Sequence, residues 1–522
     1  MVDRKFRVIV VGGGPVGLTM AHTLSKAGIE YVVLERRPTV LEEAGATLVI
    51  APNGMRAFKQ LGLYERLREI SVECLAFQMC TEDGRQYNTL SVFDEFTVDF
   101  GCSSSIFNRA ELIKVIYEGL SEEDQARVLT NKKVIEVTSD DQGVTVRCAD
   151  GTRYDASVVV GADGVHSAVW EHMRSISLKA SPKIKIDQEK PFVAEYRMLW
   201  ASFPLQDGKH DGPQGLCGSS LGRDHSLQYF LGKGRGWIFV YERLPTPTRE
   251  PTRYTEEDVI AVGERWGDVA VGTKLKVKDV FPRRIDAGMT NLEEGVLKRW
   301  FWERIVLVGD AAHKFTPNPG QGYMNGMEDV LTLTNILHGV LKQYHDNDEE
   351  AAASEEHVGT GPSTKVLSAA FQRYQDGRLA GAHHGCNLSG YEIRKATQRT
   401  ILLWFFETWV MPCFPRWMDS LMLEIALKKS IRNGLVLDFV DGEESIKGRA
   451  AWVHPMPNQA ARALASRKNQ RNVVAPFLSL GGIYRMGLAT SMAILIVISY
   501  LSWREYLRGS ATFPVGHIKI EL

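Results

Sequence analysis

Three glycines near the amino terminus have the spacing of a turn that binds phosphate groups. Gly12, Gly14 and Gly17 follow the apolar run at residues 8–11 and precede a helical pattern. In such a turn the first glycine allows a tight bend, and the second lets backbone N–H groups approach a diphosphate. The third lets the helix pack closely on the strand. The positive end of the helix then faces the anionic diphosphate, so this stretch predicts a dinucleotide site.

Glu35 completes the pattern, because it ends the second apolar run at residues 31–34. An acid at this position is placed to accept hydrogen bonds from ribose hydroxyls. The alternative is a glycine-rich turn without a ligand. The two strands, the helix between them and the terminal acid are all present, and together they favour dinucleotide binding. The motif does not distinguish FAD from NAD(P).

Two later apolar runs also end in a glycine and an aspartate. One run leads to Asp163 and the other to Asp310. In a doubly wound sheet, ligands bind at the carboxyl ends of the strands, so both acids are expected near the glycine turn. For Asp163 the alternative is an acid that caps a turn. We expect Asp310 to matter more for the ligand than Asp329, which lies a turn into the following helix.

Composition limits the classes of function. The chain has 522 residues, enough for two domains and further segments. Its formal net charge of −1 gives no bulk attraction for nucleic acid, and none is expected as a partner. The seven cysteines are scattered without a C-x-x-C pair, so neither a disulfide framework nor a metal site is predicted. The amino terminus leads straight into the first strand, so no secretory signal peptide is expected.

The order of the elements predicts an α/β fold. A doubly wound dinucleotide-binding domain is interleaved with a β-rich substrate domain, and a helical region follows. Asn108 is expected to cap a helix that begins at residue 109. Residues 346–363 are acidic and small, and we predict a mobile loop there. The predicted boundaries are 1–71, 104–180 and 291–345 for the dinucleotide-binding domain, 72–103 and 181–290 for the substrate domain, and 364–475 for the helical region.

A separate apolar segment lies near the carboxyl terminus. Residues 486–503 contain no charged side chain, and their length is within the range of a tilted membrane helix. The alternative is a buried core helix. Basic residues are concentrated before the segment, which predicts a single-pass protein of the endoplasmic reticulum membrane with its large domain facing the cytosol.

The motifs together resemble the fingerprints of the group A flavin monooxygenases, the para-hydroxybenzoate hydroxylase-like family. The similar positions are the glycine turn, residues 161–164, and residues 309–313 with Pro317, Gly320 and Gly322. The resemblance covers roughly residues 5–385. Residues 45–54 and 314–318, with the apolar tail, are more closely similar to fungal terpenoid, meroterpenoid and indole-diterpene epoxidases. This resemblance implies FAD as cofactor and NAD(P)H as cosubstrate.

The resemblance also implies roles for single residues. Glu35 would hold the AMP ribose of FAD, and Arg109 would contact the cofactor near its diphosphate or ribityl chain. Asp310 would bind the ribityl hydroxyls, and the helix after Gly322 would point its amino terminus at the flavin ring. Asp163 would have a joint role toward FAD and NAD(P)H.

Three further positions follow from the same resemblance. Main-chain groups of Val49 and Tyr323 would meet the flavin, and Arg197 would lie beside the ring as a catalytic residue. The alternative for Arg197 is a solvated strand arginine. The chain departs from the family at Trp170, where an arginine is usual, although Arg174 is close enough in sequence to substitute. Tyr323 and Met324 also stand where small residues are common after Gly322, which predicts a more crowded ring face.

These features predict an FAD-dependent monooxygenase that uses NAD(P)H and O2 and most simply epoxidises a prenyl or terpenoid alkene on a hydrophobic substrate. An electron-rich alkene needs no catalytic base, whereas a phenol would benefit from one. His225, Tyr229 and Tyr241 are candidate bases, so aromatic hydroxylation is one alternative. A non-catalytic, membrane-tethered flavin-binding protein is another. A halogenase is disfavoured because the chain lacks a W-x-W-x-I-P segment.

Overall fold

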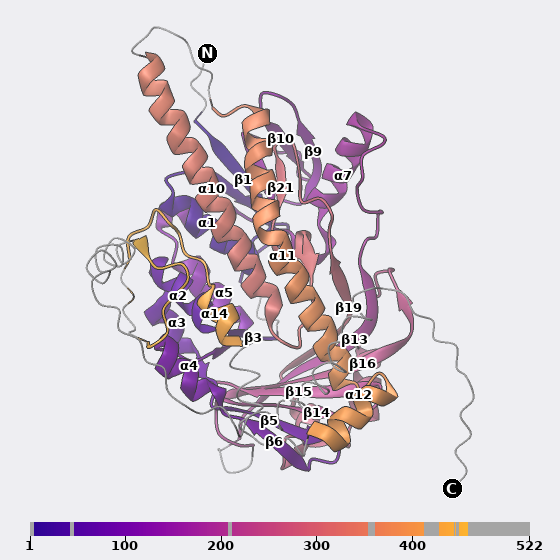
Figure 1. Cartoon of the computed structure of the whole chain (residues 1–522). Coiled ribbons are helices and arrows are strands. Elements are labelled where there is room, and N and C mark those ends of the chain that lie inside the picture. Colours follow the sequence, from indigo (N-terminus) through magenta and orange to yellow (C-terminus); the bar gives the residue numbers. More distant parts are fainter. Residues whose placement is uncertain are drawn as a thin grey trace, which may run out of the picture. The chain divides into compact units, whose positions relative to one another are not determined.

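The computed structural model describes residues 5–41, 46–206, 211–352, 361–411, 427–442, 444 and 448–457 (Figure 1). All of them belong to one compact unit, Met1–Ala461. No helix among these residues is long and apolar enough to cross a membrane. The predicted membrane segment at 486–503 lies outside the described residues.

A six-stranded sheet carries the glycine turn, and its strand order is β20-β21-β12-β1-β2-β8. Its middle strands are continuous apolar runs, as is typical of parallel strands covered on both faces. The register aligns Val11 with both Leu34 and Gly161, so these strands end at one edge. The strands are β1 (Arg7–Val11), β2 (Glu30–Leu34), β8 (Val128–Leu129), β12 (Val158–Gly161), β20 (Phe301–Trp302) and β21 (Ile305–Leu307).

Helices from distant parts of the chain pack together beside this sheet. α1 (Pro15–Lys26) packs on α5 (Arg109–Glu118) and on α10 (Gln321–Ala352). Asn108 caps α5 as predicted, because its side chain accepts a hydrogen bond from the Ala110 N–H. The remaining elements here are α2 (Pro52–Gln60), α3 (Tyr64–Ile70), α6 (Glu122–Ala126), α7 (Ala168–Ala180), and the antiparallel sheet β9 (Val134–Ser139), β10 (Val144–Cys148) and β11 (Arg153–Ala156).

An eight-stranded sheet forms the second part, in the order β22-β19-β13-β16-β15-β14-β5-β6. Its strand pairs are antiparallel except β5 with β14, which is parallel. β19 crosses the predicted boundary at residue 290. The strands are β5 (Ala76–Thr81), β6 (Gln86–Leu90), β13 (Val193–Pro204), β14 (Leu216–Leu221), β15 (His225–Leu231), β16 (Arg235–Thr248), β19 (Asp286–Val296) and β22 (His313–Lys314).

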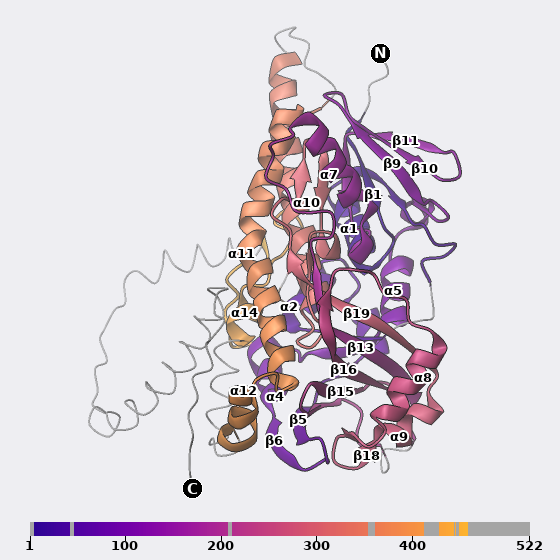
Figure 2. The same ribbon diagram turned by 90° about the vertical axis from the view of Figure 1, so that its right-hand side faces the viewer.

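The two faces of this sheet have different neighbours. Leu199 and Val240 lie in a core with Val259 of α8 (Glu256–Arg265) and with α9 (Val277–Val280), visible in Figure 2. The opposite face carries Met198 and Phe239. It packs toward a small sheet of β3 (Thr47–Ile50), β4 (Val72–Glu73) and β7 (Ser105–Asn108). This second face therefore meets β3, β7 and the loop before α10.

Two long helices connect the sheets. α10 lies against α11 (Thr364–Ala396), as both views show. The Tyr374 hydroxyl of α11 donates to the Leu307 carbonyl in the first sheet, and Thr397 beyond α11 bonds to Tyr196 in the second. One helix thus fixes the position of both sheets.

Two segments differ from the sequence-based boundaries. α10 continues to Ala352, so the first part of the predicted loop 346–363 is helical; residues 353–360 lie outside the described residues. In the predicted helical region 364–475, residues 433–442 and 448–456 contain no helix. Their path depends on contacts with α2, which local helical propensity does not reveal: the Gln60 amide donates to the carbonyls of Leu437 and Val440.

Candidate functional site

The predicted site residues come together at one edge of the parallel sheet. Gly12 follows β1, Glu35 follows β2, Asp163 follows β12, and Asp310 follows β21. These four strands are consecutive neighbours in the sheet. Residues far apart in the sequence therefore meet where a doubly wound fold binds its ligand.

The three glycines have distinct roles. Gly12 has φ +110°, and a Cβ there would lie 2.4 Å from the Ala162 carbonyl oxygen. At Gly17 a Cβ would lie 1.9 Å from the Gly12 carbonyl oxygen, so only glycine allows α1 to approach. At Gly14 nothing lies within 4 Å of a Cβ position. The turn is therefore tight on its protein side and open at Gly14, as a bound diphosphate requires.

Glu35 is buried against the glycine turn. One carboxylate oxygen accepts the Gly13 N–H at 2.6 Å, and the other accepts the Arg37 N–H at 2.9 Å. Each oxygen keeps a further lone pair for a ligand hydroxyl. These bonds fix the orientation of the carboxylate at the position where the sequence predicts a ribose contact.

Among the described residues the Asp310 carboxylate accepts no hydrogen bond, and the side chain is partly buried. Its Oδ1 lies 3.9 Å from the position that a Cβ on Gly322 would occupy, at the start of α10. Burial raises the pKa of Asp310, although the charges of His313, Lys314 and Arg109 oppose this effect. A carboxylate in this state is stabilised by hydroxyl donors from a ligand.

A buried ionic network that the sequence analysis missed holds the turn around Asp310. Asp329 of α10 accepts the Gly309 N–H at 2.9 Å and contacts His313 Nε2 at 2.6 Å. Its other oxygen accepts from Arg378 Nε of α11 at 2.8 Å. Burial opposes ionisation of Asp329, but the charges of His313 and Arg378 outweigh this and lower its pKa. Asp329 thus supports the turn that carries Asp310, and the expectation that Asp310 matters more for the ligand than Asp329 stays a prediction.

This network had only a weak signal in the sequence. His313 and Asp329 follow Asp310 at short range, but nothing local indicates that both side chains point inward. Arg378 lies on another helix, and only packing of α11 on α10 brings it to Asp329. The Arg378 guanidinium also donates to Glu328 at 2.6 Å and to Asn325 Oδ1 at 3.1 Å.

Arg109 and Gly322 lie near Asp310, and Val49 lies near the loop that precedes Gly322. Arg109 is the first residue of α5, close enough for its charge to act on Asp310. The Val49 carbonyl oxygen of β3 lies 3.9 Å from a Cβ position on Gly320, so the loop before α10 approaches β3. α10 begins at Gln321, which places Gly322 in its first turn, where free N–H groups favour negative charge.

The Tyr323 side chain points into the core between α1 and α2. The phenol is buried, and its hydroxyl lies 2.8 Å from Thr19 Oγ1 of α1. The ring also stacks at 6.3 Å on Phe58 of α2. The side chain therefore fills the core between helices, and the crowding of a ring face expected from Tyr323 and Met324 stays a prediction. Only its main chain remains available to a ligand.

Asp163 has the hydrogen bonds of a capping acid. It accepts the Ser167 hydroxyl at 2.6 Å and the Val169 N–H at 3.1 Å, at the start of α7. Burial raises the pKa of Asp163 to about 6. Arg174, the expected substitute for the arginine missing at Trp170, donates to the Asp187 carbonyl. The capping alternative for Asp163 therefore describes its contacts in the structure.

Arg197 lies on the face of β13 that packs against α8. It alternates with Tyr196 and Met198, which belong to the opposite face. Its guanidinium is 2.7 Å from Glu242 Oε2, and Glu242 also binds Arg265 of α8. The prediction that Arg197 lies beside the ring does not agree with this placement. Strand alternation is the physical reason, because the register puts its side chain away from the glycine turn.

Of the three candidate bases, Tyr241 faces the loop before α10. Its hydroxyl donates to Gln228 Oε1 at 2.9 Å, and Gln228 Nε2 donates to the Asn318 carbonyl at 3.1 Å. Burial raises the pKa of Tyr241, so the phenol stays neutral and acts as a donor. Tyr229 and His225 lie on the α8 face, where His225 stacks on Trp266 at 3.9 Å.

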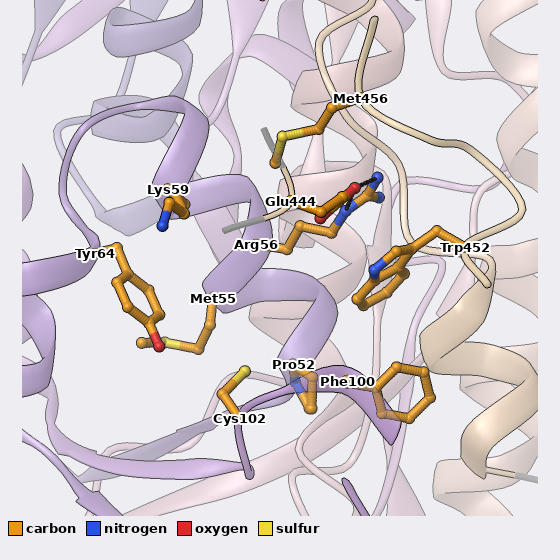
Figure 3. Close-up of a pocket in the computed structure, with 10 residues that line it drawn as sticks. All are labelled: Pro52, Met55, Arg56, Lys59, Tyr64, Phe100, Cys102, Glu444, Trp452 and Met456. Carbon is orange, nitrogen blue, oxygen red and sulfur yellow. Dashed lines mark hydrogen bonds and ion pairs between the residues drawn. The ribbon is translucent and has the colours of Figure 1, made fainter. Parts of the chain in front are cut away.

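A separate recess lies between α2 and a later part of the chain that contributes Glu444, Trp452 and Met456 (Figure 3). Arg56 crosses it, forming an ion pair with Glu444 and lying 4.4 Å above the Trp452 ring. The lining includes Tyr64 and Cys102 but no residue of the three motifs. The contacts of Arg56 with Glu444 and Trp452 hold this later part of the chain on α2. The recess is distinct from the candidate site.

The residues at the strand edge fit FAD. The turn is open at Gly14, Glu35 presents oriented oxygens, and Asp310 lacks a donor among the described residues. A dinucleotide with a polyhydroxyl chain supplies the diphosphate, ribose and hydroxyl groups that these three positions accept. The first turn of α10 adds N–H groups for a negatively charged ring.

Comparisons with known proteins agree with this geometry. Residues 5–196 and 232–357 match the FAD binding domain family, and the chain belongs to that family. It is 31% identical over 439 residues to FAD-dependent monooxygenase ausM of Penicillium brasilianum, covering 82% of this chain and 87% of the relative. It is 32% identical over 469 residues to FAD-dependent monooxygenase srdH of Neurospora crassa, covering 86% and 98%. The protein is therefore an FAD-dependent monooxygenase.

Solved structures share the fold. A single-residue variant of HpxO of Klebsiella pneumoniae, complexed with FAD, superposes with a TM-score of 0.62 at 18% identity, covering 81% of this chain and 98% of that one. The p-nitrophenol 4-monooxygenase PnpA of Pseudomonas putida DLL-E4 gives 0.59 at 21% identity, covering 82% and 96%. These likenesses confirm the α/β architecture of an FAD-binding domain interleaved with a second sheet.

Proposed function

We propose that this enzyme uses NAD(P)H and O2 to epoxidise an alkene on a prenyl or terpenoid substrate of fungal secondary metabolism. The observation that carries the proposal is the apolar face of the second sheet, which packs toward β3, β7 and the loop before α10. Met198, Trp237, Phe239 and Leu292 lie on it, and Tyr241 is held there as a neutral donor. An alkene needs no base, and such a face suits a hydrocarbon chain.

FAD, when bound, supplies the redox and oxygen-transfer chemistry. The residues of this chain bind and orient it: Glu35 accepts from the ribose, Asp310 accepts from the ribityl hydroxyls, and the first turn of α10 stabilises negative charge. The apolar sheet face excludes water from the reacting region. The Asp329 network holds Asp310 in place without touching substrate.

The test is oxidation of NAD(P)H by the full-length holoenzyme with a prenylated precursor and with its saturated analogue. We expect a product with one added oxygen from the alkene and none from the saturated chain. Hydroxylation of both substrates on an aromatic ring would favour the hydroxylase alternative. Bound FAD without NAD(P)H oxidation for any substrate would favour the non-catalytic alternative.

We also propose that residues 486–503 anchor the enzyme in the endoplasmic reticulum membrane with the catalytic unit in the cytosol. The support is the uncharged apolar run, with basic residues concentrated before it. A prenylated substrate partitions into lipid, so an anchored enzyme meets a higher local concentration. Anchoring changes access to the substrate and leaves the chemistry unchanged.

A further inference from the structure

A group of aromatic rings lies on the apolar face of the second sheet. Leu227 and Leu231 of β15 lie in the core against α8, so strand alternation places Gln228 and Phe230 on the opposite face. Phe230 packs against the cluster that contains Phe239, and its own side chain stays partly exposed. A ring with free surface on this face is available to a substrate.

The strand register places these rings in two neighbouring rows across the sheet. Phe230 lies opposite Trp237. Phe239 lies opposite Gln228 on one side and opposite Trp200 on the other. Because opposite residues on neighbouring strands share a face, the four aromatic side chains form one array. None of these cross-strand partners carries a charge.

Gln228 connects this array with the first turn of α10, where the flavin ring is expected. Its Nε2 donates to the Asn318 carbonyl in the loop before α10. Phe230 is two residues further along β15 on the same face, roughly 7 Å from Gln228 along the strand. The other partly exposed ring, Trp200, is two strands from Gln228, roughly 10 Å. Phe230 also meets Phe239 edge to face, with centroids 5.8 Å apart and planes at 79°, which fixes its orientation.

We propose that Phe230 is a catalytic residue whose ring stabilises the positive charge that develops on the alkene during oxygen transfer. The inference rests on the proposed function and adds a residue to it. In that reaction the π bond of the alkene breaks, and two C–O bonds form to one atom of O2. The O–O bond breaks, and the second oxygen atom leaves as water with the hydride of NAD(P)H and one proton from solvent.

Positive charge develops because the oxygen atom withdraws electrons from the alkene before both C–O bonds are complete. The charge collects on the more substituted carbon, where alkyl groups donate electrons. The face of an aromatic ring attracts positive charge, and the attraction is larger where water is excluded, so one ring can change the rate roughly 2-fold to 30-fold. The cross-strand partners of Phe230 and Phe239 offer no carboxylate for this purpose, which leaves the π face as the stabilising group.

The test replaces Phe230 in the full-length holoenzyme by mono-, di- and trifluorinated phenylalanine. Fluorine withdraws electrons from the ring face and leaves its shape nearly unchanged. The probe is farnesyl phenyl ether, and the measured quantity is the ratio of epoxide to hydrogen peroxide. Hydrogen peroxide forms when O2 takes the hydride and a proton without transferring oxygen to the alkene, so the ratio reports the oxygen-transfer step. We expect it to fall with each fluorine, by at least about fivefold over the series.

Phe203 is the matched control, because it belongs to the same sheet but lies in the core against α8. Fluorination of Phe203 should leave the ratio unchanged. A ratio that does not depend on fluorination of Phe230, with epoxide still formed, overturns the inference and leaves the proposed function intact. Absence of epoxide with the native enzyme contradicts the proposed function, and the inference then falls with it.

A binding experiment tests the ring without turnover. In a second probe, a protonated amine nitrogen replaces the more substituted carbon of the terminal alkene of farnesyl phenyl ether. Titration of the flavin absorbance should show that native holoenzyme binds this cation at least about fivefold more tightly than the saturated, neutral ether. Trifluorination of Phe230 should abolish the preference. Equal affinity of the native holoenzyme for the two compounds would refute the role of the ring.

Discussion

Arg378 and Asp329 form a buried ion pair of 2.8 Å between α11 and α10, directly behind the turn that carries Asp310. Both side chains are almost completely buried. Because Asp329 also accepts the Gly309 N–H, the pair links the packing of two long helices to the orientation of a cofactor-binding turn. The turn that carries Asp310 therefore depends on a contact between two buried side chains.

This relationship predicts that Asp310→Ala lowers FAD affinity, whereas Asp329→Ala lowers the free energy of unfolding. Asp310→Ala should lower FAD affinity about tenfold to a hundredfold, because charge-assisted bonds to ligand hydroxyls are lost. The apoprotein should keep its stability, since a poorly solvated charge is removed. Asp329→Ala should instead cost about 3–5 kcal/mol of unfolding free energy by leaving Arg378 with an incomplete set of partners. FAD titration measures the affinity of both variants, and urea unfolding measures their stability. Equal losses of stability in the two variants would contradict the prediction.

The glycine turn predicts a second contrast. Gly14→Ala should fold normally, since nothing lies within 4 Å of the added Cβ, yet bind FAD at least about tenfold more weakly because the methyl occupies the ligand side. Gly17→Ala should be destabilised by about 3 kcal/mol or more, because its Cβ would overlap the Gly12 carbonyl. Thermal unfolding and flavin content check the two changes. A stable, FAD-free Gly17→Ala protein would argue against this division of roles.

Arg197→Ala should have little effect on catalysis. Its partner Glu242 keeps Arg265, so we expect a stability loss of about 1 kcal/mol and a change in turnover of less than about twofold. Turnover and flavin content are the measurements. Tyr196→Phe on the opposite face is the control for disturbance of β13. A tenfold fall in turnover with FAD retained would restore the catalytic assignment of Arg197.

Asp163 predicts a pH dependence of stability. Its pKa is about 6 in the folded protein and about 3.9 in an unfolded chain, so the native state binds more protons between these values. The free energy of unfolding should therefore fall as pH rises from about 4 to about 6, by up to about 2 kcal/mol. Asp163→Asn should remove this component. Denaturation midpoints across the range test the prediction, and identical slopes for the two proteins would refute it.

Removing the carboxyl-terminal run should release the enzyme from membranes. A chain ending at Asn472 should become soluble, keep its FAD and lose activity on apolar substrate presented in vesicles. Full-length Ile494→Lys/Ile496→Lys should fractionate similarly, because charges at the centre of a membrane helix are costly. Fractionation with flavin analysis is the measurement. Aggregation and loss of FAD in the shortened chain would instead identify the run as core.

Much of the parallel sheet could be predicted from local sequence. The runs before Gly12, Asp163 and Asp310 are short, apolar and followed by glycine, and parallel strands covered on both faces need that composition. Glu35 and Asn108 were also predictable, because a strand-ending acid and a helix cap depend on neighbours in sequence. For the same reason, the capping alternative for Asp163 could be stated before its contacts were known.

Side-chain direction in the second sheet could not be predicted in the same way. Arg197 and Tyr196 are adjacent, and which of them faces the glycine turn depends on the register of β13 with β16 and β19. A shift of one residue would exchange their faces.

The sequence by itself determined the class of cofactor and the edge of the sheet where it binds, because glycine spacing and strand-ending acids act through local backbone geometry. Only the tertiary structure decided which acid supports the turn from behind. Asp329, His313 and Arg378 come from separate elements, and burial makes their charges depend on one another. Such a network has no local pattern, since its energy arises only when packing excludes water from all three side chains.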